Sequence, residues 1–282
     1  MVRFVLTPLL ALAASCSPLK TFNALVPKDG GVQFAARNQP YAPGARGRLD
    51  LYAPRRASAG ARLPVIVFFY GGSWNSGVKE GYAFAGRALA AQGFLVAIPD
   101  YRLVPEVHFP EFVEDGAAAV RWVRANAARF GGDPDRIVLA GHSAGAYNAA
   151  MLSVDERWLG ADRRAVRGFV GLAGPYSFLP LDGPVTRAAF GRAPDLEATQ
   201  PVTHAGPGDP PALLLVAEKD RLVYPRNSLR LAAALQAAGV PAEVRTYPDV
   251  GHIGILTALS RPFRGRAPVV RDIGEFARRV TR

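Results

Sequence analysis

Short apolar runs and amphipathic stretches alternate along the chain from residue 47 onward. Nearly continuous runs of aliphatic and aromatic side chains predict strands that are buried on both faces, and they occupy residues 65–70, 94–98, 137–140, 169–173 and 212–217. Residues 48–52 alternate polar and apolar positions, as a half-buried strand does, and residues 243–247 predict the last strand.

Stretches with helical periodicity lie between these runs. In residues 111–130, apolar side chains recur every three or four positions and two glycines follow, which predicts a long helix with a defined end. Repeated strand–helix–strand units indicate an α/β fold whose mainly parallel sheet is covered by helices on both faces. The other predicted helices are residues 82–91, 144–152, 228–238 and 269–280.

Residues 174–210 interrupt the alternation. They are rich in proline, show little periodicity and lie between two predicted strands. Because loops of this length are usually functional or disordered, we interpret the segment as a small cap that borders a substrate pocket. A long surface connection without a functional part is the alternative. The α/β domain itself is predicted to span residues 46–282, with the cap as an insertion.

Residues 1–16 have the pattern of a signal peptide. An apolar stretch over residues 4–14 is too short to span a bilayer as a mature helix, and it leads through small residues into the only cysteine, Cys16. This arrangement resembles a bacterial lipoprotein signal, so we expect export to the periplasm or membrane attachment through a lipid on Cys16. A cytoplasmic location is the alternative. Residues 17–45 contain many Pro, Gly and Asn residues and predict an arm or linker, with room for an edge strand.

Charge and composition narrow the classes of function. The chain of 282 residues has a formal charge of +11, but its basic residues are scattered and no run of five or six of them occurs. We therefore expect a basic surface without nucleic-acid binding. A single cysteine allows no intramolecular disulfide, and the four histidines lack the spacing of metal ligands, so neither a metal nor another cofactor is expected.

Residues 141–145 read G-H-S-A-G and match the pattern G-x-S-x-G. They directly follow the predicted strand over 137–140 and open the predicted helix over 144–152, which is the context that a nucleophile elbow needs. Ser143 would then lie at a helix start, where the helix dipole favours developing negative charge. We predict that Ser143 is a nucleophile; an ordinary glycine-rich turn is the alternative.

A serine hydroxyl needs a neighbouring base, and histidine suits this role near neutral pH. In proteins with this elbow the acid and then the histidine follow the serine along the chain. His252 comes after the last predicted strand, whereas His204 lies inside the predicted cap. Asp220 follows the strand over 212–217 and is predicted to orient His252; Glu218 and Asp249 are the rival carboxylates.

Acyl transfer also needs N–H donors that face the oxygen on which negative charge develops. Gly71 and Gly72 end the buried run over residues 65–70, and paired glycines let the backbone turn its amides toward a substrate. Ala144, the residue after the nucleophile, is predicted to supply a further donor. The side chains predicted to line the pocket are those of Trp74, His142, Tyr147 and Phe178, with Leu179 and Phe190 as further candidates. For Trp74 and Tyr147, packing in the core is the alternative.

Together these motifs resemble the hormone-sensitive-lipase-like carboxylesterases of the α/β-hydrolase superfamily, over roughly residues 48–280. Residues 70–74 (Y-G-G-S-W) resemble that group's H-G-G-G segment, and residues 100–106 (D-Y-R-L-V-P-E) with 109–110 (F-P) are similar to another shared stretch. Tyr70 in place of histidine and Ser73 in place of the third glycine are departures. The resemblance implies an α/β-hydrolase fold with a mostly parallel eight-stranded sheet and a small cap.

The function implied by the resemblance is a serine hydrolase that cleaves small to medium carboxylic esters through an acyl-enzyme on Ser143. The same residues would serve an arylformamidase or another amide hydrolase, and a non-catalytic binding protein on this fold is a further alternative. The expected partner is a small-molecule ester, and the oligomeric state stays open.

Overall fold

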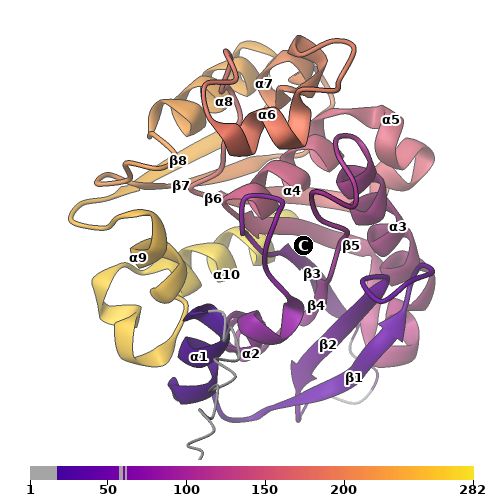
Figure 1. The fold of residues 1–282 in the computed structure, drawn as a ribbon. Helices are drawn as coiled ribbons and strands as arrows, with labels where there is room; N and C mark the ends of the chain where they lie inside the picture. The colour runs from indigo at the N-terminus through magenta and orange to yellow at the C-terminus, as the bar shows by residue number, and fades with distance from the viewer. Residues whose placement is uncertain (1–17, 57–59, 61) are drawn as a thin grey trace, which may run out of the picture.

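An eight-stranded sheet runs through the centre of the protein (Figure 1). The computed structural model describes residues 18–56, 60 and 62–282. The strands lie in the order β1-β2-β4-β3-β5-β6-β7-β8; β1 and β4 pair antiparallel with β2, and all other pairs are parallel. The mostly parallel sheet predicted from the sequence is confirmed. Its strands are β1 (Val32–Pro40), β2 (Arg48–Pro54), β3 (Leu63–Phe69), β4 (Leu95–Pro99), β5 (Gly132–His142), β6 (Val166–Leu172), β7 (Ala212–Ala217) and β8 (Ala242–Tyr247).

Helices cover both faces of the sheet (Figure 1). On one face α2 (Ala83–Ala90) contacts β2 and β4, and α10 (Val269–Val280) contacts α2, β6 and β7. On the other face α3 (Glu111–Asn126) and α4 (Ala144–Val154) contact each other and β5, and α8 (Arg226–Ala237) contacts β7 and β8. This is the two-sided cover that the strand–helix alternation predicted.

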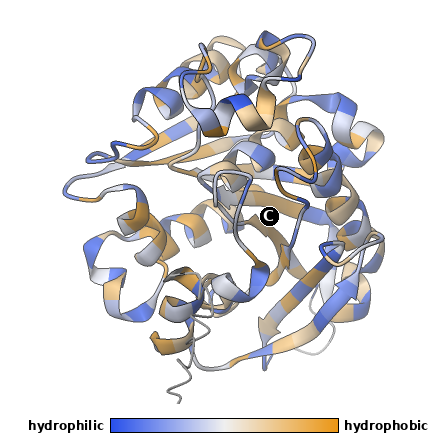
Figure 2. Cartoon of the chain, viewed as in Figure 1, coloured by the Kyte–Doolittle hydropathy of each residue, from blue (hydrophilic) through white to orange (hydrophobic). Residues whose placement is uncertain are grey.

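The apolar runs in the sequence form the buried layer of the sheet. Every residue of β4 and of β7 is buried, as are the last five residues of β3. In Figure 2 the central strands are mainly orange, whereas the outer helices alternate between orange and blue along their length. Parallel strands with helices on both faces have no solvated face, so their sequence reads as a continuous apolar run.

The long predicted helix over residues 111–130 forms in two parts. After α3 the chain tightens into the 3₁₀ turn η2 (Ala127–Phe130), and Gly131 then adopts φ 78°. A left-handed residue at this position is the usual end of a helix, and glycine adopts it without a steric penalty.

Residues 174–210 form three short helical segments at the top of the view in Figure 1. These are α6 (Pro184–Phe190), η4 (Glu197–Thr199) and α7 (Pro201–His204), and α7 contacts both α4 and α8. The buried ring of Phe190 attaches the segment to the domain, since its centroid lies 4.8 Å from that of Trp74 and 5.2 Å from that of Tyr147.

Residues 18–40, expected to be an arm or linker, form the helix α1 (Pro18–Leu25) and the edge strand β1, both packed on the domain. The α1 helix lies against the 3₁₀ turn η1 (Lys79–Tyr82). Asn23 fixes this contact: its amide donates to the carbonyl of Glu80 at 2.8 Å and accepts from the amide of Phe84 at 3.0 Å. Two bonds between Asp29 and Arg264, at 2.9 and 2.8 Å, hold the following loop.

Short helical segments complete the connections: α5 (Glu156–Leu159), η3 (Gly160–Ala165), α9 (His252–Thr257) and η5 (Arg261–Arg266). None of the helices in the described ranges is long and apolar enough to cross a membrane. The predicted signal peptide, residues 1–16 with Cys16, lies outside the described residues.

Candidate active site

Ser143 lies on a sharp turn between the end of β5 and the start of α4. Its backbone has φ 55° and ψ −126°, a combination that residues with side chains rarely adopt. A Cβ atom at Gly141 would lie 2.3 Å from the carbonyl oxygen of Gly145, and one at Gly145 would lie 2.2 Å from that of Phe69. Both glycines of the G-x-S-x-G pattern are therefore steric requirements of this turn.

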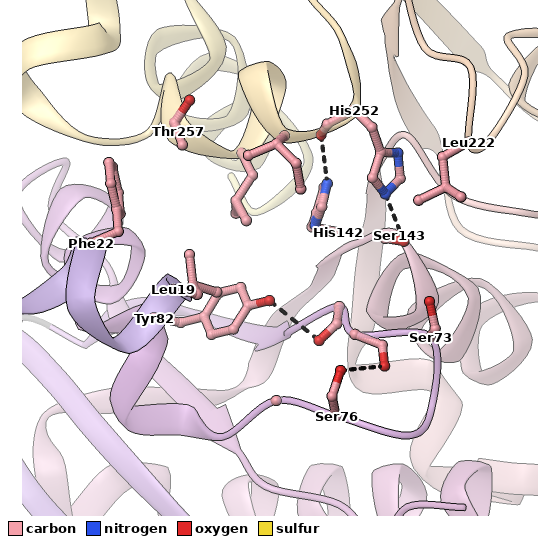
Figure 3. Close-up of a pocket in the computed structure, with 15 residues that line it drawn as sticks. Leu19, Phe22, Ser73, Ser76, Tyr82, His142, Ser143, Leu222, His252 and Thr257 are labelled. Atoms are coloured by element: carbon pink, nitrogen blue, oxygen red, sulfur yellow. Dashed lines mark hydrogen bonds between the residues drawn. The ribbon is translucent and has the colours of Figure 1, made fainter. Parts of the chain in front are cut away.

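Ser143, His252 and Asp220 are joined by hydrogen bonds in one line. Oγ of Ser143 lies 2.9 Å from Nε2 of His252 (Figure 3), and Nδ1 of His252 lies 2.7 Å from Oδ2 of Asp220. With its proton on Nδ1, the imidazole donates to Asp220 and leaves Nε2 free to accept the serine proton. The structure thus brings together three side chains from positions 143, 220 and 252.

The acid and the base come from loops at the ends of neighbouring strands. Asp220 follows β7, and His252 opens α9 after β8. The second oxygen of Asp220 accepts the amides of Leu222 at 2.9 Å and Val223 at 2.8 Å, which fixes the carboxylate against rotation. Burial alone would raise the pKa of the Asp220 carboxyl, but the bonds from His252 and these amides hold its pKa below the usual value.

The rival residues considered from the sequence lie elsewhere. Glu218 is exposed, and Asp249 is exposed and paired with Lys219. The ring of His204 bonds to the carbonyl of Ala198 at 2.8 Å inside residues 174–210. Among the described carboxylates and histidines that follow the serine, only His252 bonds Ser143, and Asp220 bonds the other nitrogen of His252.

The loop that follows β3, residues 70–74, passes directly beside the nucleophile. A Cβ atom at Gly71 would lie 3.0 Å from the Cβ of Ser143. Gly72, Ser73 and Trp74 have φ values of 129°, 55° and 58°, so three successive residues occupy the left-handed half of conformational space. Within the described chain, the amides of Gly71 and Gly72 donate to no protein acceptor. We call residues 70–74 the oxyanion loop.

Two buried tyrosine hydroxyls hold the carbonyl groups of the oxyanion loop. Tyr101 donates to the carbonyl of Tyr70 at 2.7 Å, and Tyr82 donates to that of Gly71 at 3.2 Å (Figure 3). In a planar trans peptide the carbonyl and the following N–H point in opposite directions. Holding these two carbonyls therefore directs the amides of Gly71 and Gly72 to the opposite side.

The two departures from the H-G-G-G segment have separate consequences. The Tyr70 side chain points away from the nucleophile and donates to Oδ1 of Asp100 at 2.8 Å, with its ring stacked 4.7 Å from Tyr101 and 5.3 Å from Tyr82. It therefore anchors the loop from behind. Ser73 adopts the left-handed φ that glycine would accept without strain, so this substitution stores strain beside the nucleophile.

Two cavities meet at Ser143. The α1/α9 cavity, of about 390 Å³, lies between α1, the oxyanion loop and α9 (Figure 3), and it is lined among others by Leu19, Phe22, Gly71, Ser143, His252 and Leu256. The cap cavity, of about 490 Å³, lies under residues 174–186 and beside α8, and it is lined among others by Trp74, Ser143, Phe178, Val185, Arg226 and Arg230. The nucleophile therefore faces one space on each side.

Comparisons with known proteins agree with this geometry. The family model BD-FAE matches residues 49–177. Carboxylesterase NlhH of Mycobacterium tuberculosis is 33% identical over 228 residues, which cover 73% of this chain and 70% of that protein. The chain belongs to the carboxylesterase family of α/β-hydrolases. Esterase LipQ of the same organism is 32% identical over 253 residues, covering 81% of this chain and 60% of LipQ.

Other relatives are longer or known by structure. A probable isoprenylcysteine α-carbonyl methylesterase of Arabidopsis thaliana is 29% identical over 82% of this chain, which spans about half (53%) of that protein's length. The solved structure of EstE1, a thermostable carboxylesterase cloned from a metagenomic library, superposes with a TM-score of 0.76 at 25% identity. That match covers 94% of this chain and 93% of EstE1.

The residues predicted to line a pocket in this carboxylesterase family member divide into two groups. His142 lines the α1/α9 cavity, while Trp74, Phe178 and Leu179 line the cap cavity. Tyr147 lines neither: it is fully buried and its hydroxyl donates to the carbonyl of Thr199 at 2.7 Å, so it packs behind the wall of the cap cavity. Phe190, buried against Trp74 and Tyr147, is likewise behind that wall.

His142 has a structural contact with the base. Its Nε2 lies 3.0 Å from the carbonyl oxygen of His252 and donates to it when protonated at that nitrogen. Burial and the neighbouring His252 ring lower the pKa of His142 from about 6.5 to about 3. The ring therefore stays neutral and holds the start of α9.

The sequence reasoning missed the roles of α1 and of the bracing tyrosines. Leu19, Phe22 and Val26 recur at helical spacing, which could have indicated a helix in the predicted linker. No local signal connects Tyr82 with Gly71, because the contact depends on the path of the chain between them. In the described residues no three His, Cys, Asp or Glu side chains gather as a metal site requires.

Proposed function

We propose that this protein is a serine hydrolase that cleaves small to medium carboxylic esters through an acyl-enzyme on Ser143. The observation that carries the proposal is the hydrogen-bonded line from Ser143 through His252 to Asp220, with bond lengths of 2.9 and 2.7 Å, at the meeting point of two cavities. Such a line activates a serine hydroxyl for attack on an acyl carbon.

In the first half of the reaction, Oγ of Ser143 attacks the ester carbonyl while Nε2 of His252 takes the hydroxyl proton. The negative charge moves to the carbonyl oxygen, where the amides of Gly71, Gly72 and Ala144 stabilise it. Ala144 is the first residue of α4, so its amide has no partner within the helix. The proton on His252 then passes to the leaving alcohol, and the acyl group remains on Ser143.

In the second half, a water molecule gives its proton to His252 and attacks the acyl carbon. Collapse of the second tetrahedral intermediate returns the proton to Ser143 and releases the acid. Asp220 stabilises the imidazolium that forms in both halves, and its low pKa keeps it ionised for this role.

The position of His252 supports one assignment of the two cavities to the two parts of the ester. Protonated His252 must reach the leaving oxygen, and His252 lines the α1/α9 cavity but not the cap cavity. The alcohol part therefore occupies the α1/α9 cavity, and the acyl part occupies the cap cavity. A cap cavity of about 490 Å³ suits a short or medium acyl group.

Hydrolysis of a p-nitrophenyl ester series from acetate to dodecanoate tests the proposal, with protein that lacks residues 1–16. We expect turnover that falls beyond medium chains and that disappears in Ser143→Ala. N-formylkynurenine in the same assay tests the arylformamidase alternative, and faster turnover of that amide than of any ester would replace the ester assignment. Esters hydrolysed equally by Ser143→Ala would refute the acyl-enzyme.

We also propose that residues 1–16 direct export of the protein. The apolar stretch and Cys16 in residues 1–16 support export with a lipid on Cys16, which would leave α1, from Pro18, in the mature protein. Labelling with radioactive palmitate in a bacterial host should mark the wild type and not Cys16→Ser. Equal absence of label from both, with the protein in the cytoplasm, would refute export and lipidation together.

A further inference from the structure

The cap cavity contains a pair of arginines without carboxylate partners. Arg226 and Arg230 lie one turn apart on α8, and both line the cavity that Ser143 also lines. Among the described residues, no carboxylate lies within ion-pair distance of either guanidinium. Two positive charges therefore face the space assigned to the acyl group.

Helix stability does not account for these two residues. Arg226 is the first residue of α8, where the helix dipole favours a negative charge, and the first turn contains no acidic residue. Arg230 follows four positions later on the same side, so the two like charges repel each other. The N-terminal end of α8 thus places two positive charges at the wall of the cavity.

Both arginine side chains are solvent-exposed at the mouth of the cavity, and each has one contact that leaves donors free. Nη1 of Arg230 donates to Oγ of Ser177 at 3.2 Å, and the guanidinium of Arg226 lies 4.8 Å from the ring centroid of Tyr224. A guanidinium has five N–H donors in a planar fork that matches a carboxylate. The pair therefore has unused donors in a partly fixed arrangement.

The charges of the two cavities differ. Asp182 also lines the cap cavity, so the lining has one negative and two positive side chains. No Asp, Glu, Lys or Arg among the described residues lines the α1/α9 cavity. The wall of the cap cavity also contains the aromatic side chains of Trp74 and Phe178. Aromatic and guanidinium groups in one wall fit an acyl chain that has an apolar body and an anionic group.

We propose that the cap cavity binds acyl groups that end in a carboxylate, so that half-esters of dicarboxylic acids are preferred substrates. The inference rests on the proposed ester hydrolysis and on the assignment of the acyl part to the cap cavity. The reaction itself is unchanged: the ester bond breaks, the alcohol leaves with the proton from His252, and water releases the dicarboxylate.

Matched methyl esters test the inference. Monomethyl suberate and methyl octanoate have acyl chains of the same length and differ only in the terminal carboxylate, and methanol release measures kcat/KM for each. We expect the half-ester to be favoured by about threefold to tenfold in the wild type, since two guanidinium groups can bond the carboxylate but both are exposed to solvent. In Arg226→Gln/Arg230→Gln the ratio should fall to about one. The matched control is Arg221→Gln, an exposed arginine that lines neither cavity, and it should keep the wild-type ratio.

A second pair of esters places the carboxylate on the alcohol part instead of the acyl part. For 7-carboxyheptyl acetate and octyl acetate we expect no preference for the charged alcohol, because the α1/α9 cavity is uncharged. A wild-type ratio near one for the methyl esters, a ratio retained in the double variant, or a preference for the charged alcohol would each overturn the inference. If the wild type hydrolyses p-nitrophenyl esters but neither methyl ester, the inference fails and ester hydrolysis stands; if it hydrolyses none of these esters, both fail.

Discussion

The α1/α9 cavity and the cap cavity share one nucleophile but are built from different material. The first is walled by the N-terminal helix and α9 and has no charged side chain among its described residues, whereas the second is walled by the cap and α8 and has two arginines. Catalysis and selectivity are therefore expected to be separable in this molecule. We infer that turns at the ends of the strands supply the chemistry and that elements added around the sheet determine the choice of substrate.

The largest effect should come from a change that the two cavities share. Asp220→Asn keeps the size of the side chain but removes the charge that orients His252, so kcat should fall by about 10⁴ for every ester. Values of kcat for a series of esters with different acyl parts and for a series with different alcohol parts show whether the loss is the same in the two series. Asp249→Asn, at an exposed carboxylate, serves as the control and should change kcat less than twofold or so. A larger loss in the control than in Asp220→Asn would contradict the assignment.

Tyr82→Phe tests the brace of the oxyanion loop, which both cavities also share. Removing only the hydroxyl frees the Gly71 carbonyl, and misdirection of the Gly72 amide should lower kcat by about tenfold to a hundredfold with little change in KM. Tyr52→Phe is the matched control, because the buried Tyr52 hydroxyl has no partner in the described structure. The affinity for an alkyl trifluoromethyl ketone should fall in parallel with kcat/KM. A change in KM alone would show that the ring of Tyr82 only lines the cavity.

The pH dependence of stability tests whether the α1/α9 cavity stays uncharged. Folding lowers the pKa of His142 from about 6.5 to about 3. Between these two pH values His142 is therefore protonated in the unfolded chain and neutral in the folded protein. Stability is therefore complete above pH 6.5 and falls as the pH falls, by about 2 kcal/mol between pH 7 and pH 5 from this group.

His142→Gln keeps an N–H donor for the His252 carbonyl and removes the titration. Urea unfolding at pH 7 and pH 5 should show a loss that is smaller in the variant by about 2 kcal/mol, since other groups titrate equally in both proteins. Equal losses in wild type and variant would mean that His142 accepts a proton in the folded state, and the α1/α9 cavity would then gain a positive charge in acid.

The smallest expected effect distinguishes the cavities directly. Phe22→Ala removes an apolar wall from the α1/α9 cavity, so kcat/KM for octyl acetate should fall by about tenfold relative to ethyl acetate. The dependence on acyl length, measured with methyl esters, should not change. Thr21→Ala, on the exposed side of the same helix, is the control. An equal change in acyl and alcohol selectivity would contradict two separate cavities.

The strands and the elbow could be read from the sequence because their causes are local. A parallel strand covered on both faces needs a continuous apolar run, and the close approach of Gly141 to Gly145 forces the G-x-S-x-G pattern. Asp220 and His252 could be chosen because each follows a strand at the same edge of the sheet. These features depend on a few neighbouring residues or on the order of the strands.

The walls of the cavities could not be read in the same way. Phe22 lies in a stretch that looked like a linker, and its place in the wall of the α1/α9 cavity depends on the Asn23 contacts with η1 and α2. The sequence left open whether Tyr147 lines the pocket or packs in the core, and the structure places its ring behind the wall of the cap cavity. Arg226 and Arg230 belong to no sequence motif, and their proposed role in binding a carboxylate follows only from the cavity that they line.

Mass spectrometry of the protein after reaction with p-nitrophenyl trimethylacetate tests the central claim most directly. The hindered acyl group slows the attack by water, so the acyl-enzyme should accumulate after a burst of one equivalent of p-nitrophenol. The account predicts one trimethylacetyl group per chain, on the peptide that contains Ser143. Continued release of p-nitrophenol with no acyl group on Ser143, or with the group on another residue, would contradict it.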